Sequence, residues 1–157
     1  MKKLFLLLTA LLVFTISSFC EASEASNSQY IRDNYCVPAV KILTEDFLPK
    51  ADNIKNNYPV EVQDMAGADL ALYTIPKVKE LDKKLQSDKK VKHHRLTPLA
   101  QDVINKTADL LNKFAQLKDK TKLNRKAWEE EMKITLTSFV EANKAFQKSY
   151  EETQQKN

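Results

Sequence analysis

Apolar residues recur every three or four positions along most of the chain, a spacing that predicts amphipathic helices. In the second half, Thr97 is expected to cap a helix whose first turn contains Pro98, and Asn124 is expected to cap the next helix. The two apolar stripes are Leu99, Val103, Thr107, Leu110, Phe114 and Leu117, and then Trp128, Met132, Leu136, Phe139, Asn143, Phe146 and Tyr150. We therefore expect two long C-terminal helices, with a polar break at residues 118–122 between them and a frayed tail from Glu151.

Prolines interrupt the helical spacing in the first half of the chain. Apolar residues there keep a heptad-like spacing, typical of coiled-coil packing, across Pro38 and Pro49. A proline inside a helix removes a hydrogen bond and clashes with the preceding turn, so Pro49 is expected to kink or divide the segment and Pro59 to end it. Thr74 followed by Pro76 predicts a new helix start. We expect five to seven helical pieces in all.

The N-terminus has the layout of a cleaved secretory signal. Two lysines precede an uncharged apolar run at residues 4–16, which is short for a membrane span. Cys20 and Ala22 supply small residues before a cut, so we expect cleavage after Ala22, with Ala25 as the second choice. Phe19 disfavours lipid attachment at the following cysteine. We expect the protein outside the cell, or in the periplasm if its source is a Gram-negative bacterium.

Composition supports one helical domain after this leader. We interpret residues 1–22 as the signal peptide and residues 23–157 as a single all-α domain with one core. Gly67 is the one glycine in the chain, which disfavours hairpins and phosphate-binding loops. Cleavage removes two lysines and one glutamate, which leaves 23 basic and 20 acidic residues and a net charge of +3. This mild charge suits a soluble surface and does not favour nucleic-acid binding.

Cys36 is the one cysteine left after cleavage, which excludes an intramolecular disulfide. A buried small apolar residue is the expected role, and a dimer-forming thiol is the alternative. The sequence therefore predicts no disulfide within the domain and no metal site built on cysteines.

The most basic stretch of the chain is DKKVKHHRL, residues 88–96, between two expected helices. His93 and His94 are adjacent and would diverge by about 100° on a helix. No other histidine or cysteine pair completes a ligand set, so we expect no metal. The stretch is either a solvated basic connection or a patch that attracts lipid headgroups or a ligand carboxylate. The cations that would steer such an anion are Lys89, Lys90, Lys92 and Arg95.

Catalytic motifs are absent from the sequence. It contains no Gly-rich loop, no GxSxG and no recognisable cysteine–histidine signature, and the acidic run at residues 129–131 suits a solvated helix face. We therefore expect no enzymatic activity and no cofactor. Asn105-Lys106-Thr107 is a glycosylation sequon if the host is eukaryotic, and Asn105 is expected to face water on its helix.

Large apolar residues are numerous for one small domain. They either fill a core or line an apolar cavity between helices. Thr107 and Asn143 interrupt the stripes with polar groups, which either meet a ligand headgroup or hydrogen-bond to each other or to the backbone. The candidates for a cavity lining are Phe47, Tyr73, Leu81, Val103, Leu110, Phe114, Trp128, Phe139 and Phe146.

Two segments resemble known families. LALYTIPKVKELDKKL (residues 70–85) followed by LTPLAQDVINKTADLLNKFAQL (residues 96–117) resembles the middle of the secreted nematode fatty-acid- and retinol-binding proteins. LNRKAWEEEMKITLTSFVEANKAF (residues 123–146) is similar to the secreted SXP-type antigens of nematodes. The first resemblance implies an all-α wedge of several helices with an internal apolar cavity, which carries fatty acids and retinol without an enzymatic step.

Two functions follow as expectations. The first is a secreted carrier of a fatty acid, retinol or a similar apolar lipid, with transient contact with anionic membranes. The alternative is a secreted or periplasmic helical interaction module, such as a chaperone-like protein, an inhibitor or a host-interaction factor, with no small-molecule ligand. A carrier needs helices that leave a central space, whereas an interaction module needs an exposed apolar patch. Neither function involves nucleic acid.

Overall fold

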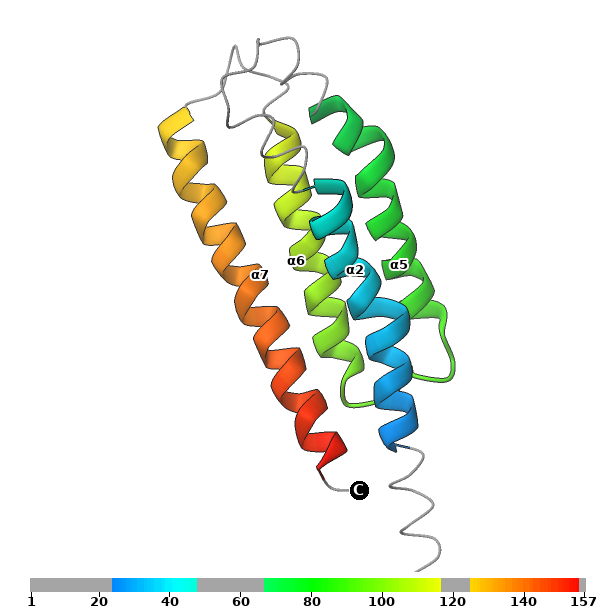
Figure 1. The fold of residues 1–157 in the computed structure, drawn as a ribbon. Coiled ribbons are helices and arrows are strands. Elements are labelled where there is room, and N and C mark those ends of the chain that lie inside the picture. The colour runs from blue at the N-terminus through cyan, green and yellow to red at the C-terminus, as the bar shows by residue number, and fades with distance from the viewer. Residues whose placement is uncertain (1–23, 48–66, 117–124, 156–157) are drawn as a thin grey trace, which may run out of the picture.

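The computed structural model describes residues 24–47, 67–116 and 125–155, and these residues form helices and turns without a strand. They make four helical rods that lie side by side (Figure 1). The expected all-α fold with two long C-terminal helices is therefore confirmed. The expected features that lie outside the described residues are the signal peptide with its cut after Ala22, the effects of Pro49 and Pro59, the polar break at 118–122 and the cap at Asn124.

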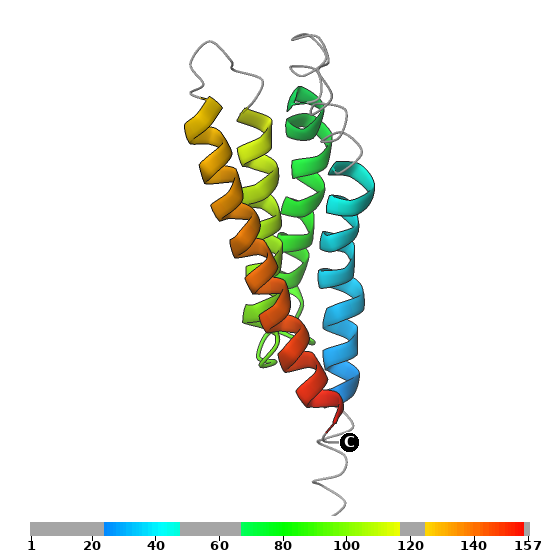
Figure 2. The ribbon, with the colours of Figure 1, turned by 60° about the vertical axis from the view of Figure 1, so that its left-hand side comes forward.

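Each rod is continuous, although the helix type changes along two of them. The first rod consists of residues 24–31, η1 (Arg32–Cys36), α2 (Val37–Lys41) and η2 (Ile42–Phe47), and the second of residues 67–69, η3 (Leu70–Thr74) and α5 (Ile75–Ser87). The third rod is α6 (Thr97–Ala115) and the fourth is α7 (Arg125–Gln154). The start of the first rod, the connection at 88–96 and the end of α7 lie at one end of the bundle (Figure 1, Figure 2), here named the latch end.

The π-helical stretches η1 and η3 explain how prolines fit into these rods. Each ends two residues before a proline, in the pairs Cys36 and Pro38, and Thr74 and Pro76. The Val37 N–H donates to the carbonyl five residues back, and the Ile75 N–H does the same. This wider turn absorbs the hydrogen bond and the space that a proline ring disrupts. The expected helical pieces are therefore stretches of different helix type, and the new helix start expected at Thr74 and Pro76 is a change from π to α hydrogen bonding within one continuous rod.

The start of α6 and the end of α7 differ from expectation. Leu96, not Thr97, is the N-cap of α6, and it makes no side-chain cap hydrogen bond. The Thr97 hydroxyl instead donates to the carbonyl of Val91 at 2.5 Å. The frayed tail expected from Glu151 is wrong, because α7 stays helical through Gln154. A hydrogen bond from the connection between α5 and α6 helps to keep this end of α7 helical, as described below.

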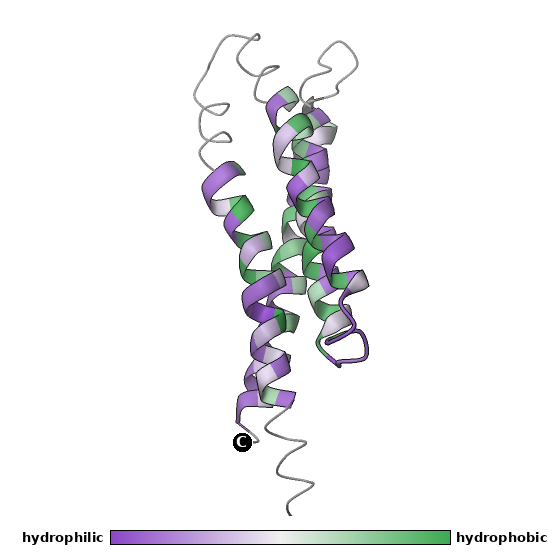
Figure 3. Cartoon of the chain, turned by 90° about the vertical axis from the view of Figure 1, so that its right-hand side faces the viewer, coloured by the Kyte–Doolittle hydropathy of each residue, from purple (hydrophilic) through white to green (hydrophobic). Residues whose placement is uncertain are grey.

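The buried core comes mainly from the first three rods. Figure 3 shows apolar residues gathered along the sides where the rods lie against one another. Among the described residues of α7, Ala142 and Phe146 are the buried hydrophobic ones. α7 packs mainly against α6 and leaves Ile134, Leu136 and Val140 exposed at 66%, 49% and 40%. Leu136 therefore does not belong to the buried stripe in which the spacing had placed it.

Cys36 is buried in the first rod, which agrees with the interpretation of a small apolar residue. Burial raises the pKa of its thiol to about 12, so the thiol stays protonated at neutral pH. A protonated and buried thiol is a poor nucleophile, which disfavours the alternative of a dimer-forming cysteine.

Candidate functional site

The basic stretch at residues 88–96 is a series of tight turns that joins α5 to α6. The backbone N–H groups that donate to a carbonyl three residues back are those of Asp88, Val91, His94 and Thr97. Val91 and Leu96 are fully buried, so apolar side chains anchor the stretch against the bundle. It is a packed connection whose charged side chains face outward.

Two of the four proposed anion-steering cations have partners within the protein. The Nε of Arg95 pairs with Oε1 of Glu24 at 2.7 Å, and an Nη atom of Arg95 donates to the hydroxyl of Thr153. The Nζ of Lys90 lies 4.0 Å from the ring centre of Tyr30, within range of a cation–π interaction. The other two cations, Lys89 and Lys92, are exposed. The connection therefore uses part of its charge to hold the first rod and α7.

A second polar contact joins the first rod to α7 at the latch end. The Nη1 of Arg32 donates to the hydroxyl of Tyr150 at 2.9 Å, and the guanidinium carbon lies 4.9 Å from the centre of the same ring. Thr153, one turn further along α7, is 3% exposed and donates to the carbonyl of Ser149 at 2.8 Å. The end of α7 is thus held by side chains of two other segments, which explains why it does not fray.

His94 is a structural link in this region. The backbone N–H of Leu96 donates to its Nδ1 at 3.2 Å, which places the proton of a neutral ring on Nε2. The Nε2 lies 3.3 Å from both the hydroxyl of Ser28 and the carbonyl of Glu24, so it can donate to either. In residues 24–47, 67–116 and 125–155, no group of three or more His, Cys, Asp or Glu side chains is placed to hold a metal ion.

Tyr35 and Asp88 form the third link between the first rod and the connection. The Tyr35 hydroxyl donates to Oδ2 of Asp88 at 2.6 Å, and the backbone N–H of Lys90 donates to Oδ1 at 2.9 Å. The hydrogen bond from Tyr35 lowers the pKa of Asp88, and burial raises the pKa of Tyr35. Asp88 is therefore a carboxylate at neutral pH that two donors hold in place.

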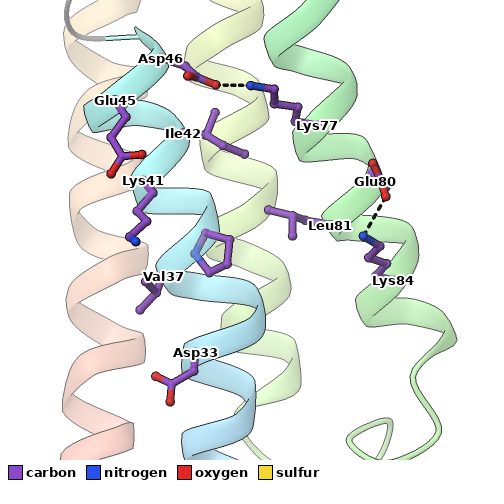
Figure 4. A pocket seen from close by; sticks show the side chains of 11 residues that line it. Asp33, Val37, Lys41, Ile42, Glu45, Asp46, Lys77, Glu80, Leu81 and Lys84 are labelled. Carbon is purple, nitrogen blue, oxygen red and sulfur yellow. Dashed lines mark hydrogen bonds and ion pairs between the residues drawn. The ribbon is translucent and has the colours of Figure 1, made fainter.

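A groove lies between the first rod and α5 (Figure 4), and we name it the α2–α5 groove. It has a volume of about 460 Å³ and is open to solvent. Its apolar lining residues are Val37, Pro38, Ile42 and Leu81. Its charged lining residues are Asp33, Lys41, Glu45, Asp46, Lys77, Glu80 and Lys84. Ile42 and Leu81 lie in an apolar strip between the two rods, charged residues border it on both sides, and Val37 lies on the border formed by the first rod, in line with Asp33 and Lys41 (Figure 4).

Ion pairs fix part of the charged border. The Nζ of Lys77 lies 2.6 Å from Oδ2 of Asp46, which joins α5 to η2 across the groove. The Nζ of Lys84 lies 2.7 Å from Oε1 of Glu80 along α5. The hydrogen bond from Lys84 lowers the pKa of Glu80, which keeps that carboxylate charged. These charges define the border of the groove at neutral pH.

The nine residues predicted to line a cavity do not come together around one described hollow. Leu81 lines the α2–α5 groove. Phe47, Val103, Leu110, Phe114 and Phe146 are buried in the core, Trp128 and Phe139 are partly buried against it, and Tyr73 is 64% exposed. Thr107 donates to the carbonyl of Val103 at 2.8 Å and has no need of a ligand, whereas Oδ1 of Asn143 is buried without a hydrogen-bond partner.

The sequence prediction missed the groove because its residues are spread over two faces that look unremarkable in isolation. Lys77, Glu80 and Lys84 have the spacing of a solvated helix face. Val37 and Ile42 fit no regular α-helical stripe, because the π turns shift the faces of the first rod. The available signal was Pro38, directly after Val37, because a change of helix type beside a proline alters which residues are exposed.

Two further observations concern the surface. Asn105 is exposed on α6, as predicted, and its Oδ1 accepts a hydrogen bond of 3.4 Å from Nε2 of Gln101. Glycosylation at Asn105 stays a prediction. Within the described ranges, no helix has the combination of length and apolar character that crossing a membrane requires.

Comparisons with known proteins give the chain no relative. No model of a protein family, no curated protein and no solved structure matches it. The likeness to the two nematode families therefore stays an interpretation of the residue patterns at 70–117 and 123–146. The function has to be inferred from the chemistry of the α2–α5 groove.

Proposed function

We propose that the protein is a secreted helical interaction module that holds a segment of a partner protein in the α2–α5 groove. The observation that supports this most is the composition of the groove, an apolar strip bordered by seven charged side chains. An apolar centre within a polar rim is the usual anatomy of a protein–protein interface. The signal-like layout of residues 1–22 favours an extracellular location for this binding.

The groove suits a peptide segment better than a buried small molecule. Pockets for small ligands bury most of the ligand and are lined mainly by apolar side chains with a few polar groups. Here the charged residues outnumber the apolar ones, seven to four, and the hollow is open. A segment whose backbone stays hydrated and whose apolar side chains reach the strip fits this lining.

The borders indicate the charge of the partner. The first rod contributes Asp33, Glu45 and Asp46 with one lysine, whereas α5 contributes Lys77 and Lys84 with one glutamate. One border is mainly acidic and the other mainly basic. We infer an amphipathic helix with two or three apolar anchors, basic residues on the flank that faces the first rod and acidic residues on the other flank.

Selection from a displayed library of helical peptides tests the proposal. Binders are expected to carry the apolar anchors and the two charged flanks described above, and the affinity of each is measured by fluorescence anisotropy. Val37→Asp replaces an apolar lining residue of the groove with a charge at a side chain already 36% exposed, so the fold is expected to be kept and peptide affinity to fall about tenfold or more.

Leu72→Asp is the matched control, because Leu72 is 67% exposed on η3 and does not line the groove. Affinity is expected to stay unchanged in this variant. Selected peptides that bind wild type and V37D equally well would place the interaction elsewhere and contradict the proposal. Circular dichroism of both variants confirms that each retains its helices.

A lipid carrier is the second candidate, and one observation favours it. Lys41, Lys77 and Lys84 border the apolar strip and would suit a fatty-acid carboxylate above its acyl chain. Titration with a fluorescent fatty-acid analogue tests this function. A saturable signal displaced by oleate, and weakened by glutamine at these three lysines, supports a carrier, whereas the absence of saturation rejects it.

A further inference from the structure

A second hollow continues the α2–α5 groove toward the latch end. It has a volume of about 440 Å³, is open to solvent, and shares the lining residues Leu81 and Lys84 with the groove. On the first rod, the positions that line the two hollows are 30, 33–35, 37–38, 41–42 and 45–46, which recur every three or four residues along one face. The two hollows are therefore parts of one trough, and we name the second one the end hollow.

The end hollow has a different lining from the rest of the trough. Tyr30 and Tyr35 contribute aromatic rings from the first rod, and Asp88 contributes a carboxylate from the end of α5. The centres of the two rings lie 6.2 Å apart, with edge-to-face geometry. Aromatic rings beside a carboxylate favour a cation, because the ring faces are electron-rich and the carboxylate is negatively charged.

The hydrogen bonds of Asp88 leave its charge uncompensated. Its two donors, the Tyr35 hydroxyl and the backbone N–H of Lys90, are both neutral groups. The other charged lining residue, Lys84, has its Nζ 2.7 Å from Oε1 of Glu80 and is thus already paired. The lining of the end hollow therefore presents a negative charge to a partner.

The side chain of Lys90 shows that this end of the trough attracts a cation. Its Nζ lies 4.0 Å from the centre of the Tyr30 ring, although Lys90 is exposed and does not line the end hollow. An exposed contact of this kind is weak, because water and salt screen it. A cation that reaches both the Tyr30 ring and the Asp88 carboxylate would therefore replace it.

We propose that the end hollow binds an arginine side chain of the partner segment, an inference that rests on the proposed function of the groove. Arginine fits better than lysine, because its planar guanidinium can stack on an aromatic ring and donate two hydrogen bonds to one carboxylate. Asp88 lies seven positions after Leu81, which corresponds to about 10 Å along a helix. A helical partner therefore carries the arginine about seven residues from the apolar anchor that meets Leu81, on the same face.

The helical peptides selected against the groove test this inference. They are expected to carry an arginine at the stated spacing, and each is compared with a version in which glutamine replaces that arginine. Fluorescence anisotropy measures the affinity of both versions for wild type and for D88N, in which the amide oxygen can still accept the hydrogen bond from Tyr35. D88N is expected to weaken binding of the arginine version about fivefold or more, and to change binding of the glutamine version by less than about twofold.

D82N is the matched control, because it makes the same change on α5 at a residue that lines neither hollow. It is expected to leave both affinities unchanged. Selected peptides without the arginine, an unchanged affinity of the arginine version for D88N, or equal losses for both versions would each overturn the arginine site. The proposed function survives these three results if V37D still weakens binding, whereas peptides that V37D does not weaken overturn both.

Discussion

The hydroxyl of Tyr35 donates a 2.6 Å hydrogen bond to Oδ2 of Asp88, and this bond ties the first rod to the residue at which α5 ends. Tyr35 is buried, so a movement of the connection away from it would leave a buried hydroxyl without a hydrogen-bond partner, which costs free energy. The contact therefore couples the packing of the first rod to the path of the basic connection.

Tyr35→Phe is expected to lower the free energy of unfolding by about 1 kcal/mol, because it removes one partly buried hydrogen bond and little volume. Urea denaturation followed by circular dichroism measures the change. Y73F is the matched control, since Tyr73 is 64% exposed, and its effect is expected to stay within about 0.5 kcal/mol. An equal loss in both variants would mean that the bond to Asp88 contributes nothing specific.

The same contact predicts a pH dependence. The hydrogen bond from Tyr35 holds the pKa of Asp88 below its ordinary value of 3.8. A carboxyl whose pKa is lowered by folding contributes stability that is complete above its unfolded pKa and is lost as the pH falls through the folded one. The stability difference between wild type and Y35F is therefore expected to be constant from pH 7 to about 5 and to shrink below about pH 4.

Urea titrations of the two proteins at several pH values between 7 and 3 measure this difference. D88N serves as the control, because an amide at this position does not titrate. A difference between wild type and Y35F that grows as the pH falls would contradict the sign derived above.

Arg95 is expected to hold the last turn of α7. Its guanidinium pairs with Glu24 and donates to Thr153, so R95Q removes a link between three segments of the latch end. The global free energy of unfolding is expected to change by less than about 1 kcal/mol, since Arg95 is exposed. Amide hydrogen exchange at residues 151–154 is nevertheless expected to become several-fold faster, because a helix end opens locally.

K92Q is the control for this prediction, since Lys92 lies on the same connection, is exposed and has the same charge. Exchange at the end of α7 is expected to stay unchanged in K92Q. Equal protection of residues 151–154 in R95Q and wild type would show that Thr153 alone holds the last turn.

The helical fold could be predicted because it depends on regular spacing and on composition. The stripe from Leu99 to Phe114 repeats every three or four residues, and its members are buried or partly buried on α6. The effect of the prolines is harder to predict. An α-helical pattern assumes that each N–H donates to the carbonyl four residues back, and a proline lacks this N–H. The π turns that precede Pro38 and Pro76 let a rod continue where propensity alone predicts a break.

The α2–α5 groove could not be predicted, because it depends on which faces meet in space. Lys77 and Asp46 are 31 residues apart, and sequence spacing says nothing of their 2.6 Å ion pair. The composition of the basic connection predicts its charge but not its contacts. The burial of Val91 and the pairing of Arg95 with Glu24 depend on the packing of the first rod.

Phe114 provides a test of whether the aromatic residues form a core or line a space for lipid. Its ring centre lies 4.7 Å from that of Phe47 and 5.8 Å from that of Trp128, both with edge-to-face geometry. The indole Nε1 of Trp128 donates to the carbonyl of Lys113 at 2.7 Å, which fixes that ring at the end of α6. F114A is therefore expected to lower the free energy of unfolding by about 3–5 kcal/mol.

Trp128 is the one tryptophan in the chain and lies beside Phe114, so its fluorescence reports this unfolding directly. F139A is the matched control, because Phe139 is partly buried and its truncation is expected to cost less. A lining residue of a lipid cavity would behave differently, because its truncation would enlarge an existing space and change fatty-acid affinity more than stability. F114A that unfolds like wild type but no longer binds a fluorescent fatty acid would reject the core role and favour the carrier.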